Sequence, residues 1–252
     1  MITFLLRKSF LHCWDNLYTL LCVNLCLAML MALYVYLASV QGGSLPGLVV
    51  LYLFNLLIGT TSVVAKKVSD YDPPDVSLFF LGGKTVWKDA LFFTGCVALH
   101  GMVLNYVLPF YLTLDSRLVG LFLAMVLFLV CVTWWVAMIY YYPVRLRLNL
   151  PVFTAARKAF LLFTDNLSLS FAIFLLSAVS LMLSLVTTML LPGIGLMLVF
   201  HQVAGRTLLL KYHYLESHPR AKKDISWSFL LKDDLDLIGG RSMKGILFPW
   251  KE

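Results

Sequence analysis

The residues that could do chemistry in this sequence are few, and they lie inside long apolar stretches. His100 and Asn105 share one such stretch, and His201, Gln202 and Arg206 share another. Ionisable groups inside a membrane span are candidates for function, because burying them there is costly unless they are paired or hydrated. If these side chains meet around a polar cavity, they could handle a proton or bind an anionic group.

A structural interpretation of the same residues competes with this one. Neutral histidines can form hydrogen bonds between helices, and Arg206 can extend its charged end to the membrane surface beside Lys211 and His213. We favour this interpretation because Arg206 is the one unambiguous charge within the expected spans, and no carboxylate lies there to pair with it.

The sequence lacks recognisable catalytic motifs. Gly82 to Lys84 do not form a phosphate-binding loop, because the spaced glycine and the Ser or Thr after the lysine are missing. Cys22 and Cys26 share a helical face, but no His or second Cys pair accompanies them as metal ligands would require. We therefore expect a protein that is not an enzyme and that holds no cofactor and no metal.

The elements that must position these residues are transmembrane helices. The 252 residues are 61% hydrophobic and 13% charged, whereas soluble domains average roughly 45–50% apolar and about 25% charged residues. This composition excludes a soluble globular protein. A helix needs about 20 apolar residues to cross the bilayer, and six blocks qualify. The sequence thus predicts an all-α polytopic membrane protein with spans at 17–37, 48–65, 90–112, 118–142, 167–191 and 193–210.

Lysine and arginine predict the orientation of these spans. They are abundant before the first span, in the second–third and fourth–fifth loops and after the sixth span, whereas the three other loops contain only Arg117. Short loops rich in these residues stay cytoplasmic, so we expect both termini in the cytoplasm. The net charge of +7 then faces anionic lipid headgroups and gives no reason to expect nucleic acid as a partner.

The sequence also contains an internal repeat. Residues 7–17 return as residues 157–167 with Arg, Lys, Phe, Leu, Asp, Asn and Leu at the same offsets, and residues 84–91 form a weaker third copy. Each unit has a short interfacial segment, an aspartate at the membrane boundary and a hairpin of two spans. The predicted repeats cover about 1–70, 75–147 and 151–212, which together make a transmembrane domain of residues 1–212.

Asp15, Asp89 and Asp165 occupy equivalent positions in the three copies. Each is expected near the N-terminus of the following span, where a carboxylate can cap free amides and complement the helix dipole. Ion coordination by the three carboxylates is the alternative.

Residues 213–252 differ in composition and are expected to form a cytoplasmic tail. This segment mixes charges with large apolar side chains, among them Trp227, Phe229, Phe248 and Trp250. Either the tail folds against the inner membrane surface of its own chain, or its aromatic residues dock on a protein partner. The sequence leaves both possibilities open.

The end of the fourth span and the segment after it resemble a known family. Residues 140–145 (YYYPVR), 155–163 and 165–167 (DNL), with the regions around Asn55 and 84–91, are similar to the YesL-like family of bacterial six-span membrane proteins of unknown activity. The resemblance covers residues 1 to about 215. It implies a location in the bacterial inner membrane and, through the sugar-uptake systems with which family members are associated, an accessory role in carbohydrate transport.

Two functions follow as expectations. The first is a non-enzymatic inner-membrane protein that acts as an accessory or assembly component of a transport system through its tail. The second is a small-solute transporter or channel, with a polar cavity between the third and sixth spans lined by His100, Asn105, His201, Gln202 and Arg206. Neither the oligomeric state nor a substrate can be predicted from these features.

Overall fold

The structure is a computed structural model that describes residues 1–40, 44–75, 77–187, 193–218 and 227–239, and its regular elements there are all helical. Their order along the chain is α1 (Ile2–Asp15), α2 (Leu17–Ser39), α3 (Ser44–Ser69), α4 (Ser77–Met102), the π-helix η1 (Val103–Val107), α5 (Leu108–Leu112), α6 (Arg117–Met138), α7 (Tyr141–Arg147), α8 (Val152–Asp165), α9 (Leu167–Val186), α10 (Gly193–Ser217), α11 (Trp227–Leu230) and α12 (Lys232–Ile238).

Six of the helical stretches are long and apolar enough to cross a membrane, which confirms the predicted all-α polytopic fold. Several helices extend beyond the apolar blocks in the sequence. The third begins at Ser77 instead of residue 90, and the sixth continues to Ser217 instead of ending at 210. Polar residues outside the bilayer keep the helical hydrogen-bond ladder, so hydropathy marks the apolar part of a helix and not its full length.

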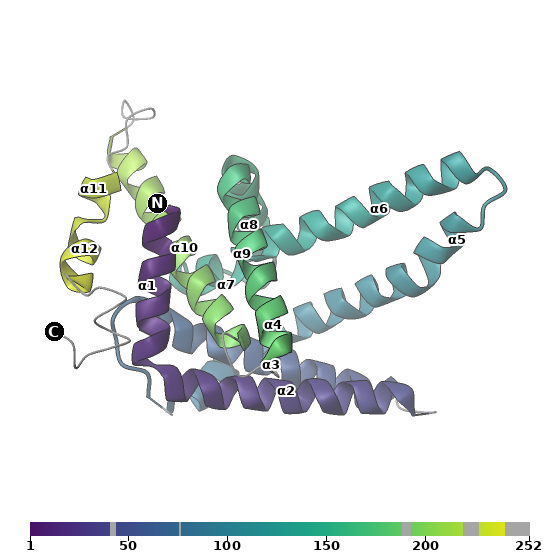
Figure 1. Cartoon of the computed structure of the whole chain (residues 1–252), viewed down its shortest axis with the longest axis horizontal. Helices are drawn as coiled ribbons and strands as arrows, with labels where there is room; N and C mark the ends of the chain where they lie inside the picture. Colours follow the sequence, from purple (N-terminus) through teal and green to yellow (C-terminus); the bar gives the residue numbers. More distant parts are fainter. Residues whose placement is uncertain (41–43, 76, 188–192, 219–226, 240–252) are drawn as a thin grey trace.

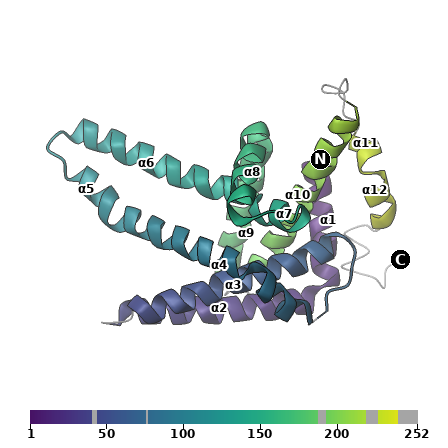
Figure 2. The ribbon, with the colours of Figure 1, turned by 180° about the vertical axis from the view of Figure 1, so that it is seen from behind.

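The arrangement of the helices is uneven. α2 and α3 lie side by side, and α1 meets α2 at a steep angle (Figure 1). The hairpin formed by the end of α4, η1, α5 and α6 projects away from the other helices in both views (Figure 2). α10 contacts α1, α2, α3, α7 and α9, so it is the central helix of the bundle.

Glycines allow α10 to occupy this central place. Gly193 starts the helix with φ +65, a left-handed conformation that side chains disfavour, and its N–H donates to Ser184 Oγ at 2.8 Å. A Cβ on Gly205 would lie 2.2 Å from Pro143 Cβ, so only glycine lets α10 approach α7 this closely. Asn24 Oδ1 accepts the N–H of Gly195 at 2.8 Å and ties α2 to the start of α10.

Prolines account for the two irregular points in the long helices. Pro109 has no N–H for the helical ladder, and the π-helical turn Val103–Val107 lies directly before its helix. Pro143 follows the break at Ile139 and Tyr140 that separates α6 from α7. This break directs the side chains of residues 140–145 toward the centre of the bundle, where Tyr140 and Tyr141 are completely buried.

The first and third repeat units share a local structure. α1 and α8 both have 14 residues, and both end on an aspartate followed by an asparagine that starts the next helix. Asn16 Nδ2 donates to His12 O at 2.9 Å, and Asn166 Nδ2 donates to Leu162 O at 3.0 Å. The second unit differs because α4 runs without a break from Ser77 to Met102, so its first segment and its span are one helix.

Candidate functional site

A cavity of about 310 Å³ lies where α3, α4, α6, α7, α9 and α10 converge. Its walls are mainly apolar and aromatic, with Phe93, Trp135 and Phe174 among them. Its polar lining residues come from four helices: Asn55 and Ser62 from α3, Tyr142 from α7, Ser177 from α9, and His201 and Gln202 from α10. An apolar pocket with a few convergent polar groups is the usual form of a small-molecule site.

Several of these polar groups have no hydrogen-bond partner. Gln202 is 1% exposed, and neither its Oε1 nor its Nε2 is hydrogen-bonded within the described residues. The same holds for the buried hydroxyls of Ser62 and Tyr142. Each buried polar group without a partner costs about 1–3 kcal/mol. A ligand that supplied donors and acceptors here would recover much of that free energy.

His201 and Asn55 form hydrogen bonds with other residues of the protein. The ring Nε2 of His201 lies 2.8 Å from Ser177 Oγ, which links α10 to α9. Asn55 Nδ2 donates to Leu51 O at 2.9 Å and to Thr94 Oγ1 at 3.3 Å. Because His201 is the one titratable side chain besides Tyr142 among the lining residues, the cavity suits an uncharged ligand.

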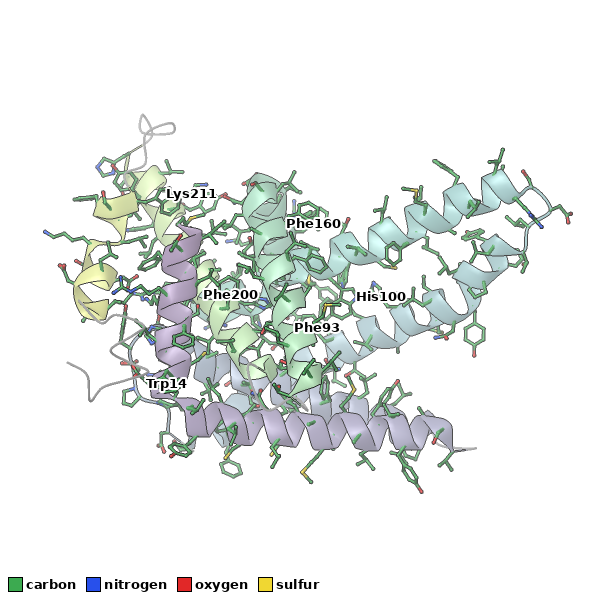
Figure 3. The ribbon with its side chains drawn as sticks, viewed as in Figure 1. Trp14, Phe93, His100, Phe160, Phe200 and Lys211 are labelled. Atoms are coloured by element: carbon green, nitrogen blue, oxygen red, sulfur yellow. The ribbon has the colours of Figure 1, made fainter. Side chains whose placement is uncertain are left out.

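The structure brings together only two of the five polar residues singled out in the sequence. His201 and Gln202 line the cavity, but His100 and Asn105 do not. His100 Nδ1 lies 2.7 Å from Cys96 O within α4 and its ring contacts Trp135, and Figure 3 places it on the projecting hairpin, apart from Phe200. Asn105 is exposed and donates to Gly101 O at 2.8 Å. The predicted five-residue site is therefore wrong in these positions, because α4 leaves the bundle before it reaches them.

Arg206 belongs to an ionic cluster at one end of the bundle, made of Lys8, Asp70, Arg147, Arg206 and Asp234. Asp234 Oδ1 accepts from Lys8 Nζ at 2.8 Å and from Arg206 Nη1 at 2.9 Å. Arg147 Nη1 donates to both oxygens of Asp70, at 2.8 and 3.0 Å. The cluster joins α1, the turn after α3, α7 and α10 to α12, so Arg206 pairs with carboxylates that lie outside the predicted spans.

The first part of the tail packs on its own chain. Leu231, Asp234 and Ile238 are each 4% exposed, and Tyr71 Oη donates to Asp234 O at 3.3 Å. Trp227 is half-buried and Phe229 is 69% exposed, while Phe248 and Trp250 lie outside the described residues. For α12, the structure therefore agrees with the interpretation that the tail folds back on its own chain.

The expected position near the N-terminus of the following span holds for Asp15 and Asp165, which lie two residues before the starts of α2 at Leu17 and α9 at Leu167, and is wrong for Asp89. Asp89 lies well inside α4, and Asp15 and Asp165 are the last residues of α1 and α8. The residues at the N-caps of α2 and α9 are Asn16 and Asn166, without side-chain cap hydrogen bonds. Asp15 and Asp165 end the interfacial helices, and one asparagine links each of these helices to the span that follows. Asp89 lies within a helix because α4 continues from its interfacial part into its span without a link.

Asp89 instead forms a buried ion pair that the sequence analysis missed. Its Oδ1 accepts from Arg145 Nε at 3.0 Å and from the hydroxyl of Tyr141, and the side chain is completely buried. Both partners come from α7. The signal was present in the sequence, because Tyr141 and Arg145 are four residues apart and so share one helical face.

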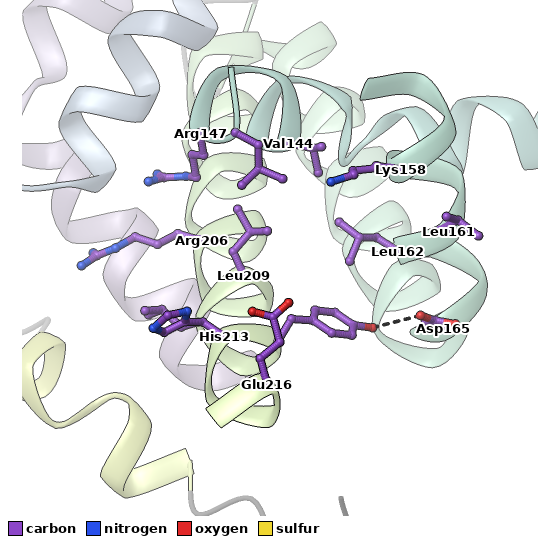
Figure 4. Close-up of a pocket in the computed structure, with 13 residues that line it drawn as sticks. Val144, Arg147, Lys158, Leu161, Leu162, Asp165, Arg206, Leu209, His213 and Glu216 are labelled. Atoms are coloured by element: carbon purple, nitrogen blue, oxygen red, sulfur yellow. Dashed lines mark hydrogen bonds between the residues drawn. The ribbon is translucent and has the colours of Figure 1, made fainter. Parts of the chain in front are cut away.

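A larger groove of about 670 Å³ opens beside the ionic cluster, between α7, α8 and α10 (Figure 4). Its floor is apolar, with Val144, Leu162 and Leu209, and Tyr212 Oη lies 3.4 Å from Asp165 Oδ2 at one side. Arg147 and Arg206 belong to its wall, but their charged ends bind the carboxylates of the ionic cluster. Lys158, also in the lining (Figure 4), is in none of the ion pairs among the described residues, so it is the positive charge that the groove offers.

Burial lowers the pKa values of Lys8 and His12 in α1. The pKa of Lys8 is lowered to about 8, chiefly by desolvation, although the hydrogen bond that Lys8 donates to Asp234 acts in the opposite direction. Desolvation, with nearby Lys8 second, lowers the pKa of His12 to about 4. His12 is therefore neutral at pH 7, with its ring against Tyr71 at 4.7 Å between centroids.

Acid should destabilise the protein through His12. In the unfolded chain His12 binds a proton below its ordinary pKa of 6.5, whereas in the folded chain it does so only near pH 4. The free energy of unfolding therefore decreases as the pH falls from 6.5 to about 4. His12→Phe keeps the ring but cannot bind a proton. Melting temperatures in detergent between pH 7 and 5 should fall less in this variant than in the wild type, and equal decreases would contradict the assignment.

Comparison with known proteins adds no relative: no protein-family model, curated protein or solved structure matches this chain. The fold and the cavity thus define the class, a polytopic α-helical membrane protein with a small intramembrane pocket.

Proposed function

We propose that this membrane protein is not an enzyme and that it binds a small uncharged molecule inside its helix bundle, as a small-solute transporter would. The observation that carries the proposal is the cavity itself, whose lining includes Gln202, a 1% exposed residue with an amide that has no hydrogen-bond partner among the described residues. Amides that donate and accept at once suit a hydroxyl, carbonyl or amide on the ligand. The neutral lining disfavours ions.

The accessory role in a transport system remains a second proposal, and a different observation favours it. α5 packs chiefly on α6 and its neighbour η1, and the first half of α6 has exposed apolar side chains, with Leu118 at 83%, Phe122 at 66% and Met125 at 63%. A pair of spans that stands apart from its own bundle can pack against helices of another membrane protein. The resemblance to the YesL-like family supports the same role, in carbohydrate uptake, by association.

The proposed setting is the inner membrane of a bacterium, with both termini cytoplasmic. The ionic cluster supports this orientation because it gathers the basic segments around Lys8, Arg147 and Arg206 at one end of the bundle. Basic loops remain on the cytoplasmic side during insertion.

Gln202→Leu should uncouple stability from binding. The substitution removes a buried amide without partners, so the empty protein should melt at the same temperature as the wild type or higher. It also removes the hydrogen bonds offered to a ligand, so a molecule that the wild type retains through purification should be lost, as measured by native mass spectrometry after release from detergent. Asn105→Leu is the matched control, since it removes an exposed amide of the same membrane domain away from the cavity. A ligand retained equally by all three proteins would contradict the proposal.

A further inference from the structure

The groove between α7, α8 and α10 lies where apolar spans end. Asp165, in its lining, precedes the asparagine that leads into α9, and Tyr212 and Glu216 belong to the part of α10 beyond the apolar block that ends at residue 210. A helix that continues past its apolar block leaves the hydrocarbon region there. The groove is therefore placed at the membrane boundary. It shares no described lining residue with the cavity at Gln202, which is called the first cavity below.

Charged groups of both signs line this groove without being neutralised by the protein. Lys158 and Glu216 are exposed, and neither belongs to an ion pair among the residues that the structure describes. Asp165 Oδ2 accepts from Tyr212 Oη at 3.4 Å, which is a long hydrogen bond. Figure 4 shows Lys158 extending from α8 toward α10, the helix that carries Glu216. The groove thus offers one ammonium group and two carboxylates.

The positions of these groups keep the two signs of charge apart. Lys158 and Asp165 are two turns apart on α8, so they share one side of the helix at a separation of about 10 Å along its axis. A lysine and an aspartate one turn apart would pair with each other, whereas this spacing leaves room for a molecule between them. Glu216 is one turn from Tyr212 on α10, and Tyr212 contacts Asp165. The two carboxylates therefore gather around Tyr212, away from Lys158.

The chemistry of the groove matches a lipid with charges of both signs in its headgroup. Its apolar lining residues are Val144, Leu148, Leu161, Leu162, Leu209 and Leu210. An apolar floor at the membrane boundary suits an acyl chain. Carboxylates accept hydrogen bonds from a primary ammonium, which has three N–H donors, whereas a quaternary ammonium has none. A headgroup with only negative charge would be repelled by Asp165 and Glu216.

We propose that this groove binds a zwitterionic phospholipid with a primary amine, of the phosphatidylethanolamine type. The phosphate pairs with Lys158, the ammonium pairs with Asp165 and Glu216, and an acyl chain lies on the leucine side chains of the floor. Arg147 and Arg206 also line the groove, but they bind carboxylates of the ionic cluster, so Lys158 is the cation left for the phosphate. The inference goes beyond the proposed function, because it assigns a second site that is separate from the first cavity.

The experiment measures the binding of three lipids with identical dioleoyl chains to the full chain in detergent, by native mass spectrometry. The lipids are a phosphatidylethanolamine, a phosphatidylcholine and a phosphatidylglycerol. Lys158→Gln removes the cation, and Asp165→Asn combined with Glu216→Gln removes both carboxylates. Arg157→Gln is the matched control, because Arg157 is exposed on the same helix but does not line the groove. All these positions are exposed, so the variants should melt at the same temperature as the wild type.

Two further variants separate this site from the first cavity. Ala178→Phe fills the first cavity from α9. Leu175→Phe, at a position 62% exposed on the same helix, is the control for the added ring. Neither residue lines the groove, so both variants should bind the phosphatidylethanolamine as the wild type does. The lipid site can therefore be tested whether or not the first cavity holds a ligand.

The expected result is a preference for one headgroup that depends on the three charged residues. The wild type and Arg157→Gln should bind the phosphatidylethanolamine about fivefold more tightly than either other lipid, as solvent-accessible ion pairs allow. Lys158→Gln should bind it about fivefold more weakly than the wild type. The variant without both carboxylates should lose the preference over phosphatidylglycerol, a change in selectivity that a structural role of these residues would not cause.

Four results would overturn the inference. Phosphatidylglycerol binding as strong as that of phosphatidylethanolamine would contradict the role of the carboxylates, and equally strong phosphatidylcholine binding would contradict a primary amine. Equal binding by Lys158→Gln and Arg157→Gln would show that Lys158 does not hold the phosphate. These three results leave the proposed function intact. Loss of the phosphatidylethanolamine from Ala178→Phe, but not from Leu175→Phe, would instead place the lipid in the first cavity.

Discussion

Asp89→Ala is expected to cause the largest loss of stability of any single substitution in this protein. The carboxylate is completely buried and accepts from Arg145 Nε at 3.0 Å and from the Tyr141 hydroxyl. Its removal leaves the guanidinium of Arg145, which is 13% exposed, without its partner in the interior. Breaking a buried ion pair in this way costs about 3–5 kcal/mol. The melting temperature in detergent should therefore fall by roughly 10 °C.

A double substitution tests the reason for this loss. If the cost comes from the unpaired charge, Asp89→Leu combined with Arg145→Leu should recover much of the stability, because apolar replacement of both partners of a buried pair is often nearly neutral. Asp72→Ala is the control, because the pair of Asp72 with Lys67 is 55% and 46% exposed and contributes at most about 1 kcal/mol. A double variant as unstable as Asp89→Ala, or an Asp89→Ala melting temperature equal to that of the control, would contradict the pairing.

Asp234→Ala should release α12 from the membrane domain. Asp234 accepts from Lys8 at 2.8 Å and from Arg206 at 2.9 Å, and the side chain of Lys8 is only 1% exposed. The substitution leaves Lys8 buried and unpaired, which costs about 3 kcal/mol of docking free energy. Amide hydrogen exchange in residues 232–238 should then accelerate by roughly 10²-fold, because exchange follows the free energy of local opening.

The neighbouring carboxylates supply the control for this effect. Asp233 and Asp236 are exposed on the same helix, so their replacement by alanine should change exchange little. Asp234→Leu combined with Lys8→Met removes both charges and should partly restore protection. If Asp234→Ala leaves the exchange of α12 unchanged, the ionic cluster does not hold the tail.

The six spans were predictable because their signal is local. An apolar block of sufficient length has few alternatives to a membrane helix, and repeated residues such as Asp15–Asn16 and Asp165–Asn166 point to equivalent helix junctions. The continuous α4 was not predictable in the same way. The sequence predicts a helix start at Asp89 because the residue is charged. In the structure Arg145, from a distant segment, neutralises this charge, so α4 continues past Asp89.

The site was predictable only in part for a similar reason. The positions of His201 and Gln202 near the middle of a span correctly marked them as candidates, but the sequence does not show which helices converge on them. The projecting hairpin carries His100 and Asn105 away from the bundle, and the tail supplies Asp234 as the partner of Arg206. Other polar lining residues are Asn55, Ser62 and Tyr142. Residues of these types are common in membrane spans, so no single one of them predicts a site.

The central claim is that the first cavity holds an uncharged molecule, and its most direct test is native mass spectrometry of the protein purified from its own membranes. The account predicts an adduct of defined mass on the wild type and on Leu175→Phe, which is absent from Ala178→Phe, where the added ring occupies the cavity. Extraction of the adduct should give a molecule without ionised groups. An adduct of unchanged occupancy on a folded Ala178→Phe protein, or an ionised one, would contradict the claim.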